Sequence, residues 1–226
     1  MTKIQIAVIS DSDLVKPEAI KRDLPALQKQ IHEDFAPVWG IDAELCIVPK
    51  GKKEDATQAW RLIITDEPYP DAVGHHYSSG TPQNNPSAKV FAKKLMDEGS
   101  GWTTCASHEL LEMLVNPRDN RVVEQCENGL NRFWYQEICD PCETDSYLII
   151  LDDDPNHEVY VSNFVYPSWF GLFYNPNDPR FHRRGKGILY DHKGNINKPF
   201  QIVPGGHAKT YTIGGWGDQA APSDIR

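Results

Sequence analysis

The sequence contains no apolar run near the roughly 20 residues that a membrane-spanning helix requires. Its start, MTKIQIAVIS, is followed at once by Asp11 and Asp13, so the long apolar core and small-residue cleavage site of a secretory signal are missing. Internal repeats and low-complexity tracts are also absent. We therefore expect no membrane partner and a cytoplasmic location, with a virion-associated location as the alternative.

Basic residues are fewer than acidic ones, with 23 Lys and Arg against 32 Asp and Glu and a formal net charge of -9. A polyanion would have to approach this chain against an unfavourable overall field. The dense basic stretch RFHRRGKG at 180–187 lies among prolines and glycines, which is typical of a solvated loop. We expect no nucleic-acid partner.

Cysteine is scarce and odd in number, which is not the pattern of a small disulfide-stabilised protein. Cys139 and Cys142 form a C-x-x-C motif, but a thiol zinc site of this type needs a second pair, and only Cys126 is a plausible helper. Most of the five cysteines are therefore predicted to be free thiols. Whether Cys139 and Cys142 are joined stays open.

Two further motifs are incomplete. Ser107 lacks the G-x-S-x-G frame of a hydrolase nucleophile, so we expect it to cap or pack. The stretch LDDDPNHE at 151–158 lacks the glycine and the spacing of an EF-hand, which makes a hairpin turn the better interpretation. Neither motif predicts a site.

A globular composition is present, with 39% hydrophobic and 24% charged residues in 226. This length fits one large domain or two small lobes. Hydrophobic periodicity and turn residues predict these elements in the first half of the chain: a strand at 4–10, a helix at about 23–38 capped by Asp23 and ended by Gly40, strands at 43–49 and 59–66 that pair in one sheet, a short strand at 72–79, a loop at 80–87, an edge strand in the first half of 88–95, and a helix of about three turns ending at Asn116 and Pro117.

This order of elements predicts the fold class. Residues 1–117 should form an α+β lobe in which a backing helix and a second helix cover a mixed, twisted sheet. Residues 118–213 should form an irregular lobe that contains β structure, including strands SYLIIL and EVYVSNFV around the turn DDDPN and a hairpin turning at 193–195. Residues 214–226 are expected to be a flexible tail.

The second helix carries the motif H-E-x-x-E at His108, Glu109 and Glu112. Residues four apart on a helix stack one turn apart, so His108 and Glu112 can reach a single ion. In the related motif H-E-x-x-H, the first and last residues hold zinc and the intervening glutamate takes a proton from water. The alternative is an ordinary amphipathic helix with its acids in water.

A metal site needs a third protein ligand, and the stretch WYQEICD supplies Glu137 and Asp140 about 25 residues downstream. These acids stand among aromatic and apolar residues, where unpaired carboxylates would be costly to bury. A cation would remove that cost. One acid would be a ligand and the other its partner, and the spacing does not decide which.

These motifs together carry a resemblance. GHHYS, AKVFAKK and TTCASHELLEMLVNP, followed by WYQEICDPCE and VSNFVYPSWF, resemble a family of uncharacterised zincin-like proteins of bacteria and their phages, over about residues 20–170. The resemblance implies a metallopeptidase-like fold, with Glu109 as the base and His108, Glu112 and Glu137 as metal ligands. It implies that Asp140 orients His108 or is itself the ligating carboxylate.

Glu112 stands where H-E-x-x-H has its second histidine, and this changes the expected chemistry. Two carboxylates and one imidazole cancel the charge of a divalent ion, so water is acidified less. Zinc remains the first choice, but an oxygen-rich shell also accepts manganese, iron(II) or calcium. We predict a metal-dependent hydrolase of peptides or proteins. One alternative is a non-catalytic structural or interaction protein that the ion stabilises and that is associated with a phage particle. The other is a cluster of acids and histidine without any metal.

Four further residues are candidates for contact with substrate. His75 and His76 are adjacent on a predicted strand, so they point to opposite faces and only one can look into the cleft. Tyr135 and Tyr166 each carry a hydroxyl that can donate to an oxyanion. Packing is the alternative for both tyrosines.

Overall fold

The structure is a computed structural model that describes residues 3–48, 58–70, 72–77, 85–172, 182–183 and 187–221. The chain divides into two compact units. Unit 1 comprises Met1–Asp119 and Tyr147–Ser162, and unit 2 comprises Asn120–Ser146 and Asn163–Arg226. The chain passes from unit 1 to unit 2 after Asp119, and Tyr147–Ser162 belongs to unit 1.

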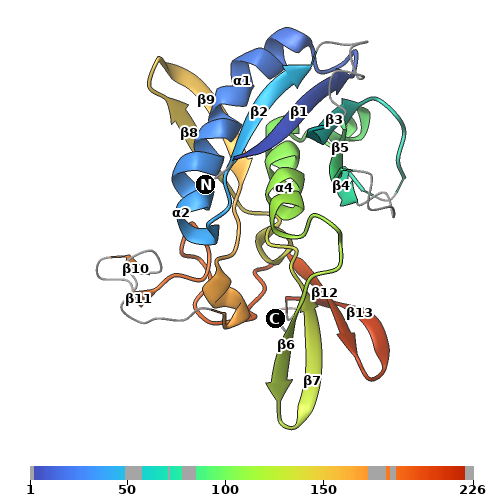
Figure 1. The fold of residues 1–226 in the computed structure, drawn as a ribbon, viewed down its shortest axis with the longest axis vertical. Helices are drawn as coiled ribbons and strands as arrows, with labels where there is room; N and C mark the ends of the chain where they lie inside the picture. The colour runs from blue at the N-terminus through green and yellow to red at the C-terminus, as the bar shows by residue number, and fades with distance from the viewer. Residues whose placement is uncertain are drawn as a thin grey trace. The chain divides into compact units, whose positions relative to one another are not determined.

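A five-stranded sheet forms the centre of unit 1 (Figure 1). Its strands, in the order β2-β1-β3-β5-β4, are Ala43–Val48, Ile4–Asp11, Trp60–Thr65, Ser87–Phe91 and Gly74–Tyr77. Neighbouring strands are parallel except β4, which runs antiparallel to β5. The mixed sheet and its helices confirm the α+β prediction at this level.

Two predictions about strand neighbours are wrong. The strands expected at 43–49 and 59–66 lie in the same sheet, but each pairs with β1 and not with the other. The strand expected at the edge, β5, lies between β3 and β4. The reason for the first error is burial: β1 is apolar on both faces, with Ile6, Ala7, Val8 and Ile9 all buried, so it takes an interior position.

The first helical segment begins earlier than predicted. It runs as α1 (Pro17–Lys29), a π-helical stretch η1 (Gln30–Phe35) and α2 (Ala36–Trp39). Pro17 occupies the first turn, where a missing N–H costs nothing. Asp23 is therefore not a cap but a buried residue inside α1, whereas Gly40 ends the segment with a φ of 70°, as predicted.

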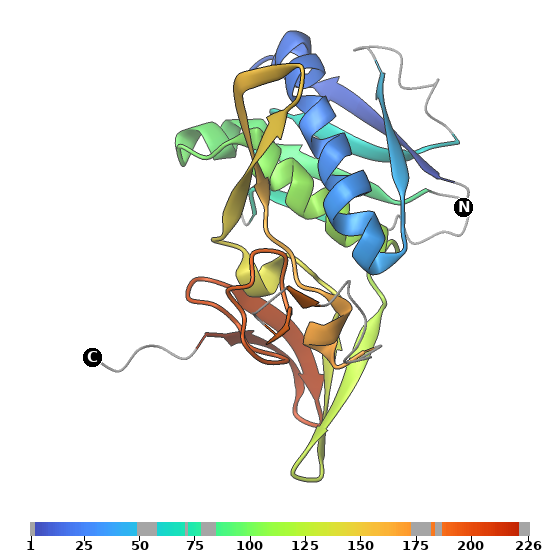
Figure 2. The same ribbon diagram turned by 90° about the vertical axis from the view of Figure 1, so that its left-hand side faces the viewer.

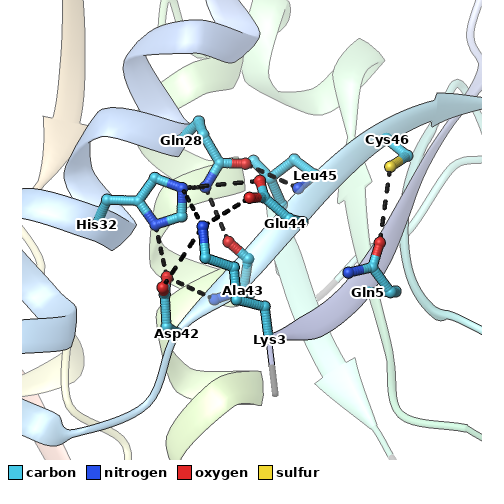
Figure 3. A network of polar contacts seen from close by, with 9 residues as sticks. All are labelled: Lys3, Gln5, Gln28, His32, Asp42, Ala43, Glu44, Leu45 and Cys46. Carbon is cyan, nitrogen blue, oxygen red and sulfur yellow. Dashed lines mark hydrogen bonds and ion pairs between the residues drawn. The ribbon is translucent and has the colours of Figure 1, made fainter. Parts of the chain in front are cut away.

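A polar network joins this helical segment to the edge strand β2 (Figure 3). Gln28 donates from Nε2 to the carbonyl oxygen of Ala43 at 2.8 Å and accepts from the N–H of Leu45 at 2.8 Å. His32 Nδ1 lies 2.5 Å from Asp42 Oδ1 in the turn before β2. Side chains thus satisfy backbone groups of β2 and fix the helix beside it.

Helices α1 and α4 (Trp102–Val115) pack side by side on one face of this sheet (Figure 2), and the short helix α3 (Ala92–Asp97) precedes α4. The hairpin of β8 (Ser146–Leu151) and β9 (Asp154–Ser162) lies against α4 and α1. It confirms the predicted turn at DDDPN. Ser107 is fully buried and accepts from the N–H of Ser162 at 2.6 Å, so its predicted packing role is confirmed.

Unit 2 contains a four-stranded antiparallel sheet in the order β13-β12-β7-β6. Its strands are Gly215–Ala220, His207–Thr212, Leu130–Tyr135 and Val122–Glu127. Short 3-10 helices η3 (Asp140–Cys142) and η4 (Pro167–Phe170) and the strand pair β10 (His182–Arg183) and β11 (Gly187–Ile188) complete its regular structure within the described residues. Trp169, Phe164 and Phe170 are buried in its core.

Two predictions for the C-terminal region are wrong. The tail expected to be flexible from 214 onward contains β13, which pairs with β12. The hairpin expected to turn at 193–195 is a loop instead, in which Gly194 donates to the carbonyl oxygen of Asp191 at 3.2 Å. Asp191 is fully buried and its carboxylate accepts from the N–H of Ile196 at 2.8 Å, so an acid anchors this loop where we expected a strand ladder.

Some predictions fall on residues that the structure does not describe. These are positions 80–84 of the predicted loop, residues 222–226 of the tail, and most of the basic stretch 180–187. Among the described residues, no helix is both long enough and apolar enough to cross a bilayer.

Candidate metal centre

Helix α4 places both glutamates of the H-E-x-x-E motif in the interior. Glu109 is 7% exposed and Glu112 is 3% exposed, although both are carboxylic acids in an acidic protein. The helix is apolar along most of its length, with Leu110, Leu111, Leu114 and Val115 buried as predicted. The alternative of a helix with its acids in water is therefore wrong.

His108 and Glu112 meet one turn apart on this helix, as their spacing predicts. Nε2 of His108 lies 3.3 Å from Oε2 of Glu112, and the two side chains are 14% and 4% exposed. The pair therefore presents an imidazole nitrogen and a carboxylate oxygen to one point.

Strand β4 brings His76 to the same group. Nδ1 of His76 lies 3.6 Å from Oε2 of Glu112 and 3.5 Å from Oε2 of Glu109, and its side chain is 7% exposed. From the sequence, His76 was only a candidate for contact with substrate and not for a place beside these acids. The strand period predicted that one histidine of the pair would face the cleft, but it carried no signal for which of the two would reach the acids on α4.

His75 points to the opposite side of β4, as the strand period predicts. Its ring lies 5.1 Å from Tyr69, 5.2 Å from Tyr77 and 5.4 Å from Phe91, measured between ring centroids. Burial lowers the pKa of His75, and the positive charge of Lys89 lowers it further. This histidine packs among aromatic rings and does not contribute to the group at α4.

Gly74 explains how β4 comes so close to α4. A Cβ at this position would lie 2.6 Å from Sγ of Cys105 and 2.7 Å from Oε1 of Glu109, both closer than real Cβ contacts allow. The absence of a side chain therefore lets the strand backbone approach the helix. Because His76 is two residues further along the strand, it points to the same side.

Burial of the group raises the pKa of Glu109, and the neighbouring carboxylate of Glu112 raises it further. His76 and His108 act in the opposite direction. The carboxyl group of Glu109 is therefore harder to ionise than that of an ordinary glutamate.

The predicted acids Glu137 and Asp140 lie in unit 2, each 9% exposed. Glu137 follows β7, and Asp140 begins η3. Nε2 of His207, on β12, lies 3.3 Å from Oδ2 of Asp140, while its Nδ1 lies 3.1 Å from Oε2 of Glu143. His207 was not singled out from the sequence, because it stands alone in a turn-rich region. The role of Glu137 or Asp140 as a metal ligand stays a prediction.

None of the five cysteines is joined in a disulfide, and Cys139 and Cys142 are fully buried. Of the two candidate tyrosines, Tyr166 is 5% exposed and its ring packs against Phe164, with centroids 5.8 Å apart. Tyr135 is half-buried beside Trp216, 4.9 Å between centroids. These surroundings favour packing for both tyrosines, and their contact with substrate stays a prediction.

Comparison with protein-family models, with curated proteins and with solved structures found no match to this chain.

Proposed function

We propose that unit 1 binds one divalent metal ion at His108 and Glu112 and uses it to hydrolyse peptide or amide bonds, as a zincin-like metallopeptidase. The observation that carries this proposal is the buried pairing of His108 Nε2 with Glu112 Oε2 at 3.3 Å, next to the buried Glu109. Helix spacing, burial and donor type all agree with this chemistry.

The energetic cost of the buried acids supports a cation. Moving an ionised carboxylate out of water costs several kcal/mol unless it is paired. Glu109 and Glu112 are both on α4 and both buried, and a neutral imidazole carries no charge that would offset two negative ones. A divalent ion compensates them fully.

The chemistry follows from the positions of the side chains. A bound divalent ion supplies Lewis acidity, which polarises a carbonyl group and lowers the pKa of water. Glu109, with its raised pKa and its place between the two ligands in sequence, accepts the proton of the attacking water and later passes it to the leaving amine. His108 and Glu112 would hold the ion.

The sheet edge supports a peptide as the substrate class. Strand β4 carries His76 and is the last strand in the order of the sheet. An extended peptide that adds to such an edge is held by main-chain hydrogen bonds, and its carbonyl groups are presented along the strand. Hydrolysis of extended peptides or unfolded protein segments is therefore the expected activity.

The remaining parts of the proposal come from the sequence. Glu137 or Asp140 is proposed as a further ligand, and zinc is the proposed ion ahead of manganese, iron(II) and calcium. A second candidate function rests on Glu112, since a carboxylate in this position acidifies water less than a histidine does. In that case the ion stabilises a non-catalytic protein, such as a component of a phage particle.

The test is hydrolysis of casein and of quenched fluorescent peptide libraries by the full chain, with zinc or manganese added. Glu109→Gln keeps the shape of the side chain but removes the base, so we expect turnover to fall by at least about 100-fold. Glu18→Gln, an exposed glutamate on α1, is the matched control and should keep full activity. Equal turnover by wild type and Glu109→Gln would refute the base, and a large melting shift on chelation without any hydrolysis would favour the structural role.

A further inference from the structure

We infer that one face of the four-stranded sheet in unit 2 binds a neutral glycan, which is a chain of uncharged sugar rings. This inference goes beyond the proposed hydrolytic function, because it uses no residue of α4 and needs no metal ion. The face is the outer side of strands β13, β12, β7 and β6, which lie side by side in that order (Figure 1).

The pairing of these strands places two rows of side chains on this face. Residues that pair across neighbouring strands lie on the same side of a sheet, and so do residues two apart on one strand. Phe133 pairs with Tyr211, which pairs in turn with Trp216. The first row is therefore Glu124, Phe133, Tyr211 and Trp216, and the second row is Val122, Tyr135, Lys209 and Asp218. We call the residues of these two rows the aromatic face.

The opposite side of the same sheet is the buried one. Its residues Val123, Trp134, Ala208 and Thr210 are each 8% exposed or less. An antiparallel sheet with one buried side usually has a polar outer side. Here the outer side carries aromatic rings instead, and Tyr211 is 40% and Trp216 is 56% exposed. Exposed apolar groups that gather in one place indicate a binding surface.

The rings of the aromatic face form one continuous strip. The ring centroid of Trp216 lies 4.9 Å from that of Tyr135 and 4.8 Å from that of Tyr211. Phe133 continues the strip, with its centroid 6.5 Å from that of Tyr211. The face of an aromatic ring is electron-rich, so it attracts the weakly positive C–H groups on the apolar side of a sugar ring. The strip therefore suits several sugar rings placed one after another.

The charged groups of the aromatic face disfavour a charged ligand of either sign. The ammonium of Lys209 lies over two rings, 4.7 Å from the centroid of Tyr135 and 5.8 Å from that of Trp216. This positive charge disfavours a cationic ligand, because it already occupies the place that a cation would take at these rings. Glu124 and Asp218 stand at the ends of the two rows, in a chain of net charge -9, and disfavour a polyanion. A neutral ligand fits both conditions.

The mixture of rings and charges favours a glycan over a protein partner. The centre of an interface between proteins is poor in lysine, glutamate and aspartate, because apolar groups of the partner would remove water from these charges without replacing it. On the aromatic face, Lys209, Glu124 and Asp218 are all exposed and share their rows with the rings. A glycan has hydroxyl groups beside each apolar ring side, and a hydroxyl can donate to a carboxylate or accept from an ammonium. It therefore satisfies the rings and the charges together.

Binding of the full chain to neutral polysaccharides tests this inference. The probes are insoluble cellulose and chitin in sedimentation assays, and their soluble hexasaccharides in isothermal titration calorimetry, all with a metal chelator present. Trp216→Ala and Tyr211→Ala should each lower the affinity by more than about 10-fold, because each removes a ring that contacts the sugar. Tyr160→Ala is the matched control and should bind as wild type does, since Tyr160 is 50% exposed on β9 in unit 1. Circular dichroism establishes that each variant is folded.

The outcomes separate a glycan from other partners. If wild type binds none of these probes, or if Trp216→Ala binds them as tightly as wild type does, the inference is overturned. Self-association of wild type that Trp216→Ala abolishes, without any binding of glycan, would assign the face to a second copy of the chain and overturn it as well. If the variants do not fold, oxidation of Trp216 in wild type by N-bromosuccinimide, located by mass spectrometry, decides the matter. Protection by a bound hexasaccharide supports the inference, and unchanged oxidation overturns it.

Discussion

Gly74 on β4 and Glu109 on α4 lie so close that a single methyl group at Gly74 would stand 2.7 Å from Oε1 of Glu109. The contact joins the strand that carries His76 to the helix that carries the other site residues. It makes the absence of a side chain at Gly74 a requirement of the site.

Gly74→Ala should therefore disturb both stability and the site. We expect a loss of about 1 to 3 kcal/mol in the free energy of unfolding, because an added methyl group in a packed interior forces its neighbours to move. Zinc affinity should fall with it, since Glu109 and the strand backbone are displaced. Gly217→Ala is the control, because a Cβ there meets no described atom within 4 Å. Chemical denaturation of both variants makes the comparison, and equal stabilities would contradict the close packing of β4 on α4.

Ser107 should contribute to stability through the backbone of β9. Ser107→Ala leaves the buried N–H of Ser162 without its acceptor at 2.6 Å, and we expect a loss of about 1 to 3 kcal/mol in the free energy of unfolding. Ser10→Ala is the matched control, since the hydroxyl of Ser10 is buried without a hydrogen-bond partner among the described residues. Urea denaturation of the two variants should show the difference. A larger loss for Ser10→Ala would contradict this account.

Asp23 joins three elements of unit 1. Its carboxylate lies 2.7 Å from Nε2 of His157 on β9 and accepts from Nε1 of Trp102 on α4 at 3.3 Å, while the residue itself is 5% exposed on α1. Asp23→Ala should cost about 3 kcal/mol, because it removes the shared acceptor of a buried network. Asp13→Ala, at an exposed position, should cost less in the same thermal melts.

The raised pKa of Glu109 predicts how stability depends on pH in the metal-stripped protein. Because the folded state raises this pKa above that of the unfolded chain, the contribution to stability is full below the ordinary glutamate pKa and is lost as pH rises through the raised value. Glu109→Gln cannot ionise, so its stability relative to wild type should increase over that pH range. The comparison of the two melting curves therefore reports the effect of ionising Glu109 in its buried surroundings.

Zinc should suppress the difference in stability between wild type and Glu109→Gln, because the ion compensates the charge of the ionised Glu109 carboxylate. Melting temperatures measured across pH with and without zinc provide the test. A wild type that gains stability relative to Glu109→Gln with rising pH, in the absence of metal, would contradict a raised pKa.

Local patterns predicted most elements of unit 1. The apolar run at Ile4–Asp11, the short strand around Gly74–Tyr77 and the helical stripe of α4 are each decided by a few neighbouring residues, and the structure has all three. The order of the strands depends on which strand is buried on both faces. That burial is a property of the whole sheet and not of a few neighbouring residues. The positions of β1 and β5 were therefore missed.

The candidate site was predictable only where its residues are close in sequence. His108, Glu109 and Glu112 follow from helix geometry alone, because four residues complete about one turn. The approach of His76 to this helix depends on the antiparallel placement of β4 and on Gly74, and no sequence period encodes a contact between elements more than 30 residues apart.

The metal content of the purified full chain tests the central claim most directly. After equilibration with zinc and removal of the excess, elemental analysis should give about one zinc per chain for the wild type and close to none for Glu112→Gln. A wild type that retains no zinc, or a Glu112→Gln protein that retains as much as the wild type, would contradict a metal centre at His108 and Glu112.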